Sequence, residues 1–521
     1  MATAYAEPVH SVSAPVSTKG SPTPSFSEPP PSRAIPTDFR SSLAAWWASS
    51  GYRDARVAED RLLRRLSYYH PPAPEPSRSW FSWNHQPASS APPPVPVPTN
   101  GLLATLRTVF IPTPDPTLAP PRPDMRIEED SSISSDDTTK SKKHKHARSL
   151  HCHHAEGLTD YINTLEFSSP ATKDSKEAVV VVHGYAAALG FFFRNWDAVA
   201  RAADATGRRT FFLDWLGMGL SSRPNPSLLA APAGSAVEAR VARAEHFFLS
   251  SLEAWRAAEG IERMVLVGHS LGGYLSSAYA LKYPERVSSL ILVSPAGIPH
   301  GQLNDKPPAP PPTRQPKPRP VSDGASLDAA ADAAEAEMHD PAASAAEAEA
   351  AAHPQQSATR RGVTKFLLWG WEKGLSPFSI LRGMGPWGPL LVGKYSSRRF
   401  ASQSADDVRD LHAYIYGTSV MRGSGEFCIS HILAPGAYAR MPIVDRISPL
   451  KVPVTFMYGD SDWMDVEGGR AAKAVLTEAG NRNVDVHVVK NAGHHLYLDN
   501  PDDSNAIIEA AIRAAPKVEA N

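Results

Sequence analysis

Short apolar runs alternate with helical patterns along two long stretches of the chain. The runs are rich in valine, isoleucine and leucine, as expected of strands that are buried on both faces of a parallel sheet. They cover residues 177–182, 210–213, 264–267, 287–293, 454–458 and 484–489. Helical spacing predicts helices between several of them, over 196–206, 235–259 and 271–282. This alternation predicts an α/β fold whose core is divided between residues 158–299 and 442–516.

A different pattern occupies residues 37–68, near the N-terminus. Apolar side chains recur at helical spacing on both sides of Gly51, which predicts two short amphipathic helices. These apolar residues are Phe39, Leu43, Trp46, Trp47, Ala55, Leu62, Leu63 and Leu66. Paired tryptophans are favoured at a membrane interface, but a helix docked on its own domain shows the same stripe. The sequence leaves both interpretations open.

Three segments lack the apolar positions that a packed core needs. Residues 1–36 are rich in Pro, Ser and Thr, so we expect a disordered N-terminal segment. Residues 69–157 have the composition of a Pro-rich and charged linker, in which 102–111 could form a short ordered piece. Residues 300–441 are expected to form a cap. Within the cap, 303–359 is Pro-rich and then Ala/Glu-rich with no apolar stripe, which predicts a disordered insert.

Composition and charge exclude several classes of function. The chain has 521 residues and 50 prolines, which indicates one catalytic domain with additions. A net charge of −1 gives no basic surface for nucleic acid. No apolar run is long enough to cross a bilayer and no secretory start is visible, so we expect peripheral membrane contact only.

The cysteines and histidines outside the core do not predict a metal centre. Cys152 and Cys428 are too few for a disulfide framework, and neither has the setting of a catalytic thiol. His151, Cys152, His153 and His154 lie too close together for one preorganised tetrahedral site. We interpret this run as part of the linker and expect neither a metal nor a cofactor.

The most informative stretch runs from Met264 to Gly273. An apolar strand turns sharply through Ser270 into a helix, and Gly268 and Gly272 flank the serine where side chains would collide with the backbone. This is the pattern of a nucleophile elbow, and it makes Ser270 the candidate nucleophile.

The partners of such a serine are expected later in the chain, in the order acid and then histidine. The strand 454–458 leads to Asp462, our candidate acid, with Asp460 and Asp465 as alternatives. The strand 484–489 leads to His494, our candidate base, with His495 as the alternative.

Backbone amides near the serine are expected to form an oxyanion hole. One comes from Tyr185 or Ala186, which follow His183-Gly184, and the other from Leu271 behind the nucleophile. We expect Asp214 to stabilise a turn rather than to take part in chemistry.

These motifs resemble one branch of the α/β hydrolases. That branch includes the fungal cardiolipin-specific deacylase, an N-acyl-phospholipid lysophospholipase and the adipose lipase coactivator, and the cap resembles the fungal group most closely. The shared motifs include Gly-His-Ser270-Leu-Gly-Gly, Ser294-Pro-Ala-Gly-Ile-Pro299, Gly385-Pro-Trp-Gly-Pro389 and Gly-His494-His-Leu-Tyr-Leu-Asp499.

The resemblance implies a fold, an activity and a location. It implies an α/β-hydrolase fold, a mostly parallel sheet flanked by helices with a helical cap, and a serine acyl hydrolase acting on membrane phospholipids. Cardiolipin is the favoured substrate, and the mitochondrial inner membrane is the expected location, with the cytoplasm or a lipid-droplet surface as alternatives.

Two other activities stay open within this resemblance. His494 and Asp499 form an H-x4-D pattern that is associated with acyl transfer to lysophosphatidic acid, but the same histidine would serve hydrolysis. The coactivator suggests a non-catalytic lipid-surface adaptor, although it lacks the serine nucleophile that is present here. Basic cap residues are candidates for binding a phosphate head group or for an ion-paired surface: Arg382, Lys394, Arg398 and Arg399.

Overall fold

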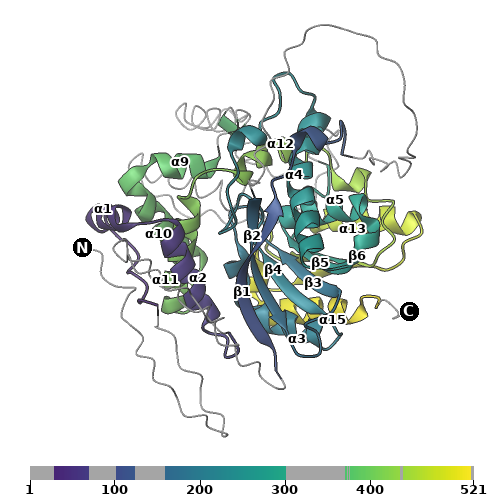
Figure 1. Cartoon of the computed structure of the whole chain (residues 1–521), viewed down its shortest axis with the longest axis horizontal. Helices are drawn as coiled ribbons and strands as arrows, with labels where there is room; N and C mark the ends of the chain where they lie inside the picture. Colours follow the sequence, from purple (N-terminus) through teal and green to yellow (C-terminus); the bar gives the residue numbers. More distant parts are fainter. Residues whose placement is uncertain are drawn as a thin grey trace, which may run out of the picture.

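The central feature of the molecule is an eight-stranded sheet. The structure, a computed structural model, describes residues 29–69, 101–123, 159–300, 370–371, 374, 376–434 and 438–517. The strands are β1 (Leu103–Pro112), β2 (Thr159–Ser168), β3 (Glu177–Val182), β4 (Arg209–Leu213), β5 (Arg263–His269), β6 (Val287–Val293), β7 (Val454–Gly459) and β8 (Val484–Val489). In space they follow the order β1-β2-β4-β3-β5-β6-β7-β8 (Figure 1).

Strands β3 to β8 run parallel, whereas β2 is antiparallel to both β1 and β4. In the middle of the sheet, Val180 of β3 lies between Phe211 of β4 and Leu266 of β5. All three side chains are fully buried, as expected of strands that are covered on both faces. The mostly parallel sheet confirms the predicted fold class, and it brings the carboxyl ends of β3, β5, β7 and β8 to one edge.

Helices cover both faces of the sheet (Figure 1). The helices of one face are α4 (Val237–Ala258), α5 (Leu271–Lys282) and α13 (Val466–Glu478), and those of the other are α3 (Trp196–Asp204) and α15 (Pro501–Ala514). Trp255 packs against Phe211 on the first face, and Trp196 against Phe212 on the second. Neighbouring residues of β4 therefore enter opposite layers, which follows from the two-residue period of a strand.

The sequence predicts a linker over 69–157 that could contain a short ordered piece at 102–111, and the structure has an ordered segment at 103–112. These residues form the edge strand β1, paired with β2 along its whole length. Ala104 and Leu106 pack in the cluster that contains α3 and α15, whereas Val109 and Ile111 pack in the cluster that contains α4 and α5. The buried positions thus change parity within the strand, which obscures the alternation in the sequence. The sheet, and with it the core, begins before residue 158.

The N-terminal segment is ordered from residue 29 onward, which corrects the prediction that all of 1–36 is disordered. Pro36 is buried, and the Ser32 hydroxyl donates a hydrogen bond to the Asp410 carboxylate in the cap. Packing against a distant part of the chain orders this segment, although its own sequence shows no preference for a helix or a strand. Residues 1–28 lie outside the described part.

The two predicted N-terminal helices are present and differ in burial. Helix α2 (Tyr52–Leu63) buries its apolar side, including Ala55 and Leu62, against helix α11 (Ala405–Ser419) of the cap. In α1 (Phe39–Ala48) Ser42 is the single buried residue, and the stripe is exposed. The exposed large side chains of α1 are Phe39, Leu43, Trp46 and Trp47, with Trp47 82% exposed. The docked interpretation therefore fits α2, whereas the apolar stripe of α1 has no such cover.

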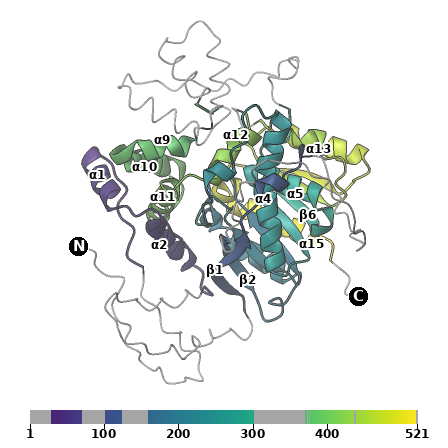
Figure 2. The same ribbon diagram turned by 45° about the horizontal axis from the view of Figure 1, so that its top comes forward.

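The cap lies beside the sheet, with α1 and α2 against it (Figure 2). Its described helices are α9 (Pro377–Gly383), α10 (Gly388–Arg399), α11 (Ala405–Ser419) and α12 (Ile429–Ile432). Arg65 pairs with Asp407 and Asp410 of α11, and Arg61 Nε lies 2.5 Å from Asp410, so α2 is held to the cap by charge as well as by packing. None of the helices in the described ranges is long and apolar enough to cross a membrane. The predicted insert 303–359 and the His151–His154 run lie outside those ranges.

Candidate active site

Ser270 occupies the turn between β5 and α5 with a left-handed backbone conformation, φ 54°. A non-glycine residue rarely adopts this conformation, and it persists only where the surroundings impose it. A Cβ on Gly272 would lie 2.6 Å from the His183 carbonyl oxygen, and one on Gly268 would collide with the Gly272 carbonyl. The two glycines thus allow strand, serine and helix to pack as the elbow that the sequence predicts.

Asp462 and His494 meet across the loops that follow β7 and β8. The Nδ1–H of His494 donates to Asp462 Oδ1 over 3.1 Å, and the Met464 N–H donates to the same oxygen over 3.0 Å. The Ser294 hydroxyl donates to Oδ2. Burial alone would raise the pKa of Asp462, but the adjacent His494 and these hydrogen bonds outweigh burial and lower the pKa. The carboxylate is therefore held ionised and aimed at the imidazole.

The alternative acids and base have other contacts. Asp460 accepts hydrogen bonds from the Asn491 and Ala492 amides, and so holds the loop that carries the histidine. Asp465 caps α13 by accepting the Glu467 N–H over 2.9 Å. The ring of His495 stacks on Phe191, with the ring centroids 5.9 Å apart. None of these three residues takes part in the carboxylate–imidazole hydrogen bond that joins Asp462 to His494.

No hydrogen bond joins Ser270 to His494 among the described residues, although their immediate neighbours are in contact. His269 Nε2 lies 3.0 Å from the His494 carbonyl oxygen, and the His269 and His494 rings are 4.8 Å apart. Catalytic hydrogen bonds are often long without substrate and tighten when it binds. The geometry thus brings the three candidate residues to one edge of the sheet and leaves His494 Nε2 for the serine.

The loop after β3 lies directly against Ser270. A Cβ on Gly184 would lie 2.7 Å from Ser270 Cβ. The Nδ1–H of His183 donates to the Gly184 carbonyl over 2.7 Å, while Nε2 accepts the Trp215 N–H over 3.1 Å. Because the C=O and N–H of a trans peptide point in opposite directions, fixing the Gly184 carbonyl also fixes the direction of the Tyr185 N–H.

Two further features lie beside Ser270: the charge state of His183 and the first N–H group of α5. Burial lowers the pKa of His183 to about 4, so the ring is neutral and can both donate and accept. Leu271 is the first residue of α5, and the N–H of a first helical residue has no acceptor within its helix. The two amides predicted for the oxyanion hole, of Tyr185 and Leu271, therefore come from elements that adjoin Ser270.

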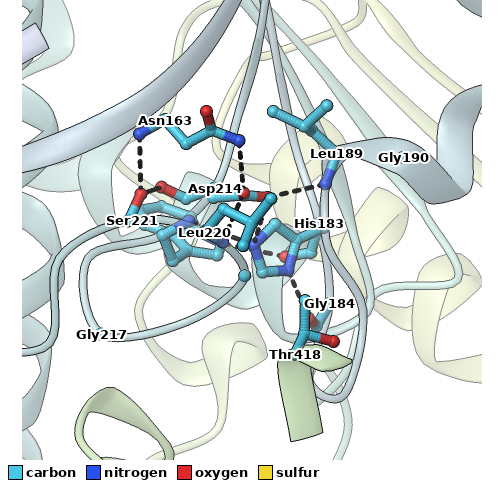
Figure 3. A network of polar contacts seen from close by, with 12 residues as sticks. Asn163, His183, Gly184, Leu189, Gly190, Asp214, Gly217, Leu220, Ser221 and Thr418 are labelled. Carbon is cyan, nitrogen blue, oxygen red and sulfur yellow. Dashed lines mark hydrogen bonds and ion pairs between the residues drawn. The ribbon is translucent and has the colours of Figure 1, made fainter. Parts of the chain in front are cut away.

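Asp214 organises the loops behind the site (Figure 3). Its carboxylate accepts hydrogen bonds from the Leu189 N–H over 2.7 Å, the Leu220 N–H over 2.8 Å and Asn163 Nδ2 over 2.9 Å. Burial raises its pKa, and these donors oppose that rise. The residue acts in the turn, as the sequence predicts.

Asp499, the acid of the H-x4-D pattern, faces the cap rather than the histidine ring. Its carboxylate receives both Nη atoms of Arg399, over 2.8 and 3.2 Å, and also the Gly493 N–H over 3.0 Å. A bidentate arginine pair is among the stronger polar contacts in proteins. Asp499 therefore ties α10 to the peptide that precedes His494.

The cap aromatics and cations take different roles. Phe378 is buried, with its ring 5.3 Å from that of Tyr185, so the cap reaches the predicted oxyanion loop. Trp387 packs on Phe39 of α1 with the centroids 4.4 Å apart. Arg382 pairs with Glu426, so it belongs with Arg399 to the ion-paired interpretation of the basic cap residues.

Two contributors to the site were not found from the sequence as functional residues. Ser294, buried with φ 43° at the end of β6, supplies a donor to Asp462. Arg399 was considered only for phosphate binding, yet it positions the histidine loop. The motif Ser294-Pro-Ala-Gly after a buried strand was the available signal for the first, and nothing local indicates the second.

Comparison with known proteins defines the class. Residues 177–501 match the family model of the alpha/beta hydrolase fold. The chain is 32% identical over 361 residues to 1-acylglycerol-3-phosphate O-acyltransferase of Arabidopsis thaliana, covering 68% of this chain and 70% of that protein. It is 30% identical over 381 residues to (lyso)-N-acylphosphatidylethanolamine lipase of Homo sapiens, covering 70% and 90%. It is 29% identical to 1-acylglycerol-3-phosphate O-acyltransferase ABHD5 of Rattus norvegicus, covering 66% and 78%.

The chain belongs to the α/β-hydrolase family. Its place among the lipid enzymes of that family, in the branch of the lysophospholipase and the lipase coactivator, is confirmed by these relatives. It is a hydrolase-fold enzyme of lipid metabolism.

Proposed function

We propose that this chain is a serine acyl hydrolase that cleaves fatty acyl esters of membrane phospholipids. Ser270 is its nucleophile, His494 its base and Asp462 its acid. The observation that carries the proposal is the Asp462–His494 pair, 3.1 Å apart, at the same sheet edge as a serine held in a left-handed elbow. A buried carboxylate that orients an imidazole beside a serine at a sharp turn is the arrangement that activates a serine hydroxyl.

The mechanism follows from these positions. His494 Nε2 takes the hydroxyl proton as Ser270 Oγ bonds to the ester carbonyl carbon, and Asp462 stabilises the imidazolium that forms. The Tyr185 and Leu271 amides bind the oxyanion. When the tetrahedral intermediate collapses, the leaving alcohol takes the proton from His494 and an acyl-Ser270 ester remains. Water, activated by the same imidazole, then releases the fatty acid.

Cardiolipin is the substrate that this proposal favours, with the mitochondrial inner membrane as its location. The support is the resemblance of the cap sequence, residues 361–442, to the fungal deacylase group. Phe378 against the Tyr185 loop provides apolar surface for an acyl chain. Arg399 is paired with Asp499, so it is not the residue that we assign to the head group.

Acyl transfer to lysophosphatidic acid is the second candidate, because two of the relatives carry that name. In this reaction the lysophosphatidic acid hydroxyl replaces water in the second step. The H-x4-D spacing adds little support, since Asp499 contacts Arg399 and the Gly493 amide and not the His494 ring.

The test offers the purified protein cardiolipin, phosphatidylcholine, or lysophosphatidic acid with acyl-CoA, each beside Ser270→Ala as control. Mass spectrometry separates fatty acid release from acyl transfer. We expect Ser270-dependent release from cardiolipin. Transfer without release from any phospholipid would replace hydrolysis by the second candidate, and no Ser270-dependent product in any mixture would favour the non-catalytic adaptor.

A further inference from the structure

A cavity of about 690 Å³ lies between α1, the cap and the loop after β4, away from the catalytic residues. None of Ser270, Asp462 or His494 lines it. Its walls include Tyr161 of β2 and Ser222 of the loop after β4. In the sheet β2 stands three positions from β5, which at about 4.8 Å per strand amounts to roughly 14 Å.

The charged residues that line this cavity are all basic. Arg223, Arg382 and Arg422 line it, and no aspartate or glutamate does. The carboxylates beside it are already engaged, since Glu426 binds Arg382 and Asp54 accepts from Ser50 over 3.0 Å. Arg382 is ion-paired with Glu426, so Arg422, whose side chain is exposed, is the guanidinium that is placed to donate parallel hydrogen bonds to phosphate oxygens.

Arg223 shows that the cavity lacks a negative partner. Its guanidinium hydrogen-bonds to backbone carbonyls, among them Gly219 over 2.9 Å and Arg422 over 3.1 Å, and its Nε is buried without a hydrogen-bond partner. A buried donor without an acceptor costs free energy until an acceptor arrives. Burial is the main cause that lowers the pKa of Arg223 to about 10; Glu426 opposes this shift and the nearby Arg382 contributes to it.

The rim of the cavity adjoins the exposed stripe of α1. Trp46 and Tyr52 line the cavity and are also exposed, and Trp47 beside them is the most exposed large apolar residue of the described chain. Tryptophan is favoured at the lipid–water interface, where its ring lies at the level of the head groups. A bilayer that receives α1 would therefore present lipid phosphates at the mouth of the cavity.

We propose that this cavity, lined by Arg223, Arg382 and Arg422, binds the phosphate head group of an anionic phospholipid in the bilayer on which α1 docks. The lipid is a ligand that holds and orients the enzyme, separate from the ester substrate at Ser270. The volume of the cavity lies within the range of small-molecule sites, about 300–1,000 Å³.

The experiment uses the full chain with Ser270→Ala, so that no lipid is consumed and binding is measured apart from catalysis. Co-sedimentation compares phosphatidylcholine vesicles with vesicles that also contain phosphatidic acid. Arg422→Ala is the test variant, because this side chain is exposed and its loss leaves no buried group unpaired. Arg40→Ala is the matched control, an exposed arginine of α1 that does not line the cavity.

We expect Arg422→Ala to weaken binding to the phosphatidic acid vesicles roughly fivefold, the equivalent of about 1 kcal/mol per arginine at a charged surface. Binding to phosphatidylcholine alone should not change, and Arg40→Ala should lose much less. Equal losses for the two variants would reduce the effect to diffuse surface charge and overturn the proposal. Competition by soluble inorganic phosphate at concentrations that leave Arg40→Ala unaffected would instead identify a site for free phosphate.

Discussion

Among single residues of the site, Ser270 has a strained backbone conformation and Asp462 is held by hydrogen bonds. Ser270 is held in a left-handed conformation between close contacts that admit only glycine at positions 268 and 272, and Asp462 receives three hydrogen bonds that keep it ionised. Such preorganisation removes reorganisation from the reaction itself. It also means that the roles of individual residues can be separated by conservative substitutions.

Ser270→Ala should abolish acyl-ester cleavage, with a loss of roughly 10⁴-fold or more, because no other group in the site replaces the nucleophile. Fatty acid release measured by mass spectrometry checks this. Thermal unfolding should stay close to that of the parent, since the substitution removes one hydroxyl at a turn. A folded variant that keeps the parent rate would refute the assignment of Ser270.

Asp462→Asn should lower kcat by roughly 10⁴-fold, because the amide cannot stabilise the imidazolium and disturbs the tautomer of His494. Asp460→Asn and Asp465→Asn are the matched controls in the neighbouring loop. They should cost far less, because Asp460 holds backbone amides and Asp465 caps a helix. The acid would be misassigned if either control were the more damaging change.

Glu59 should make the free energy of unfolding depend on pH. This buried side chain of α2 accepts hydrogen bonds from Asn163 over 3.0 Å and pairs with Arg56. Burial raises its pKa from 4.5 to about 7, Arg56 opposes the rise and Asp214 adds to it. A raised carboxyl pKa gives stability that is complete below pH 4.5 and is lost as the pH rises through about 7.

Glu59→Gln tests this dependence because glutamine does not titrate. Denaturant unfolding from pH 4.5 to 8 should show a decline in the parent, at most about 3 kcal/mol from this group, that is absent in the variant. Parallel pH profiles for the two proteins would show that Glu59 keeps one charge state across the range.

Among the secondary-structure elements, the two N-terminal helices differ in what they contact and in how far they are exposed. Helix α2 joins the cap through buried alanine and leucine side chains and through the Arg61 and Arg65 ion pairs. Helix α1 lies at the outer side of the cap (Figure 2). Its Phe39 packs on Trp387, whereas Trp47 is 82% exposed. An amphipathic helix that exposes tryptophan side chains is suited to the surface of a membrane.

Trp46→Ala combined with Trp47→Ala should weaken binding to phospholipid vesicles while leaving the melting temperature nearly unchanged, since both rings are exposed. Vesicle flotation and thermal unfolding of the same samples measure the two effects. Unchanged partitioning together with a lowered melting temperature would show instead that the rings serve internal packing.

Across the whole molecule, the core, the cap and helix α2 form a continuous packed unit. The hydrophobic cluster that contains α3 and α15 also includes residues of α2, the sheet and the cap. The cap therefore shares its core with the hydrolase sheet. The insert 303–359 belongs to the chain between β6 and the described cap. Its composition offers no apolar face with which to join this cluster.

Deleting residues 305–356 should therefore leave the melting temperature within about 2 °C of the parent, because a surface change contributes little to stability in a chain of this size. Differential scanning calorimetry checks this, with acyl hydrolysis as a second readout. A fall of many degrees would mean that the insert packs on the core.

The amino-acid sequence was enough to predict the parallel strands, the helices between them, the elbow at Ser270 and the two loops that carry the candidate acid and base. These features are local, because strand period, glycine placement and helix ends are set by residues that are neighbours in the chain. The folded structure was needed to show that Asp462, rather than Asp460 or Asp465, faces His494, and that Arg399 reaches Asp499. It also revealed β1, whose buried positions change face midway. Such pairings join segments far apart in sequence, and no local pattern encodes which distant partner a side chain meets.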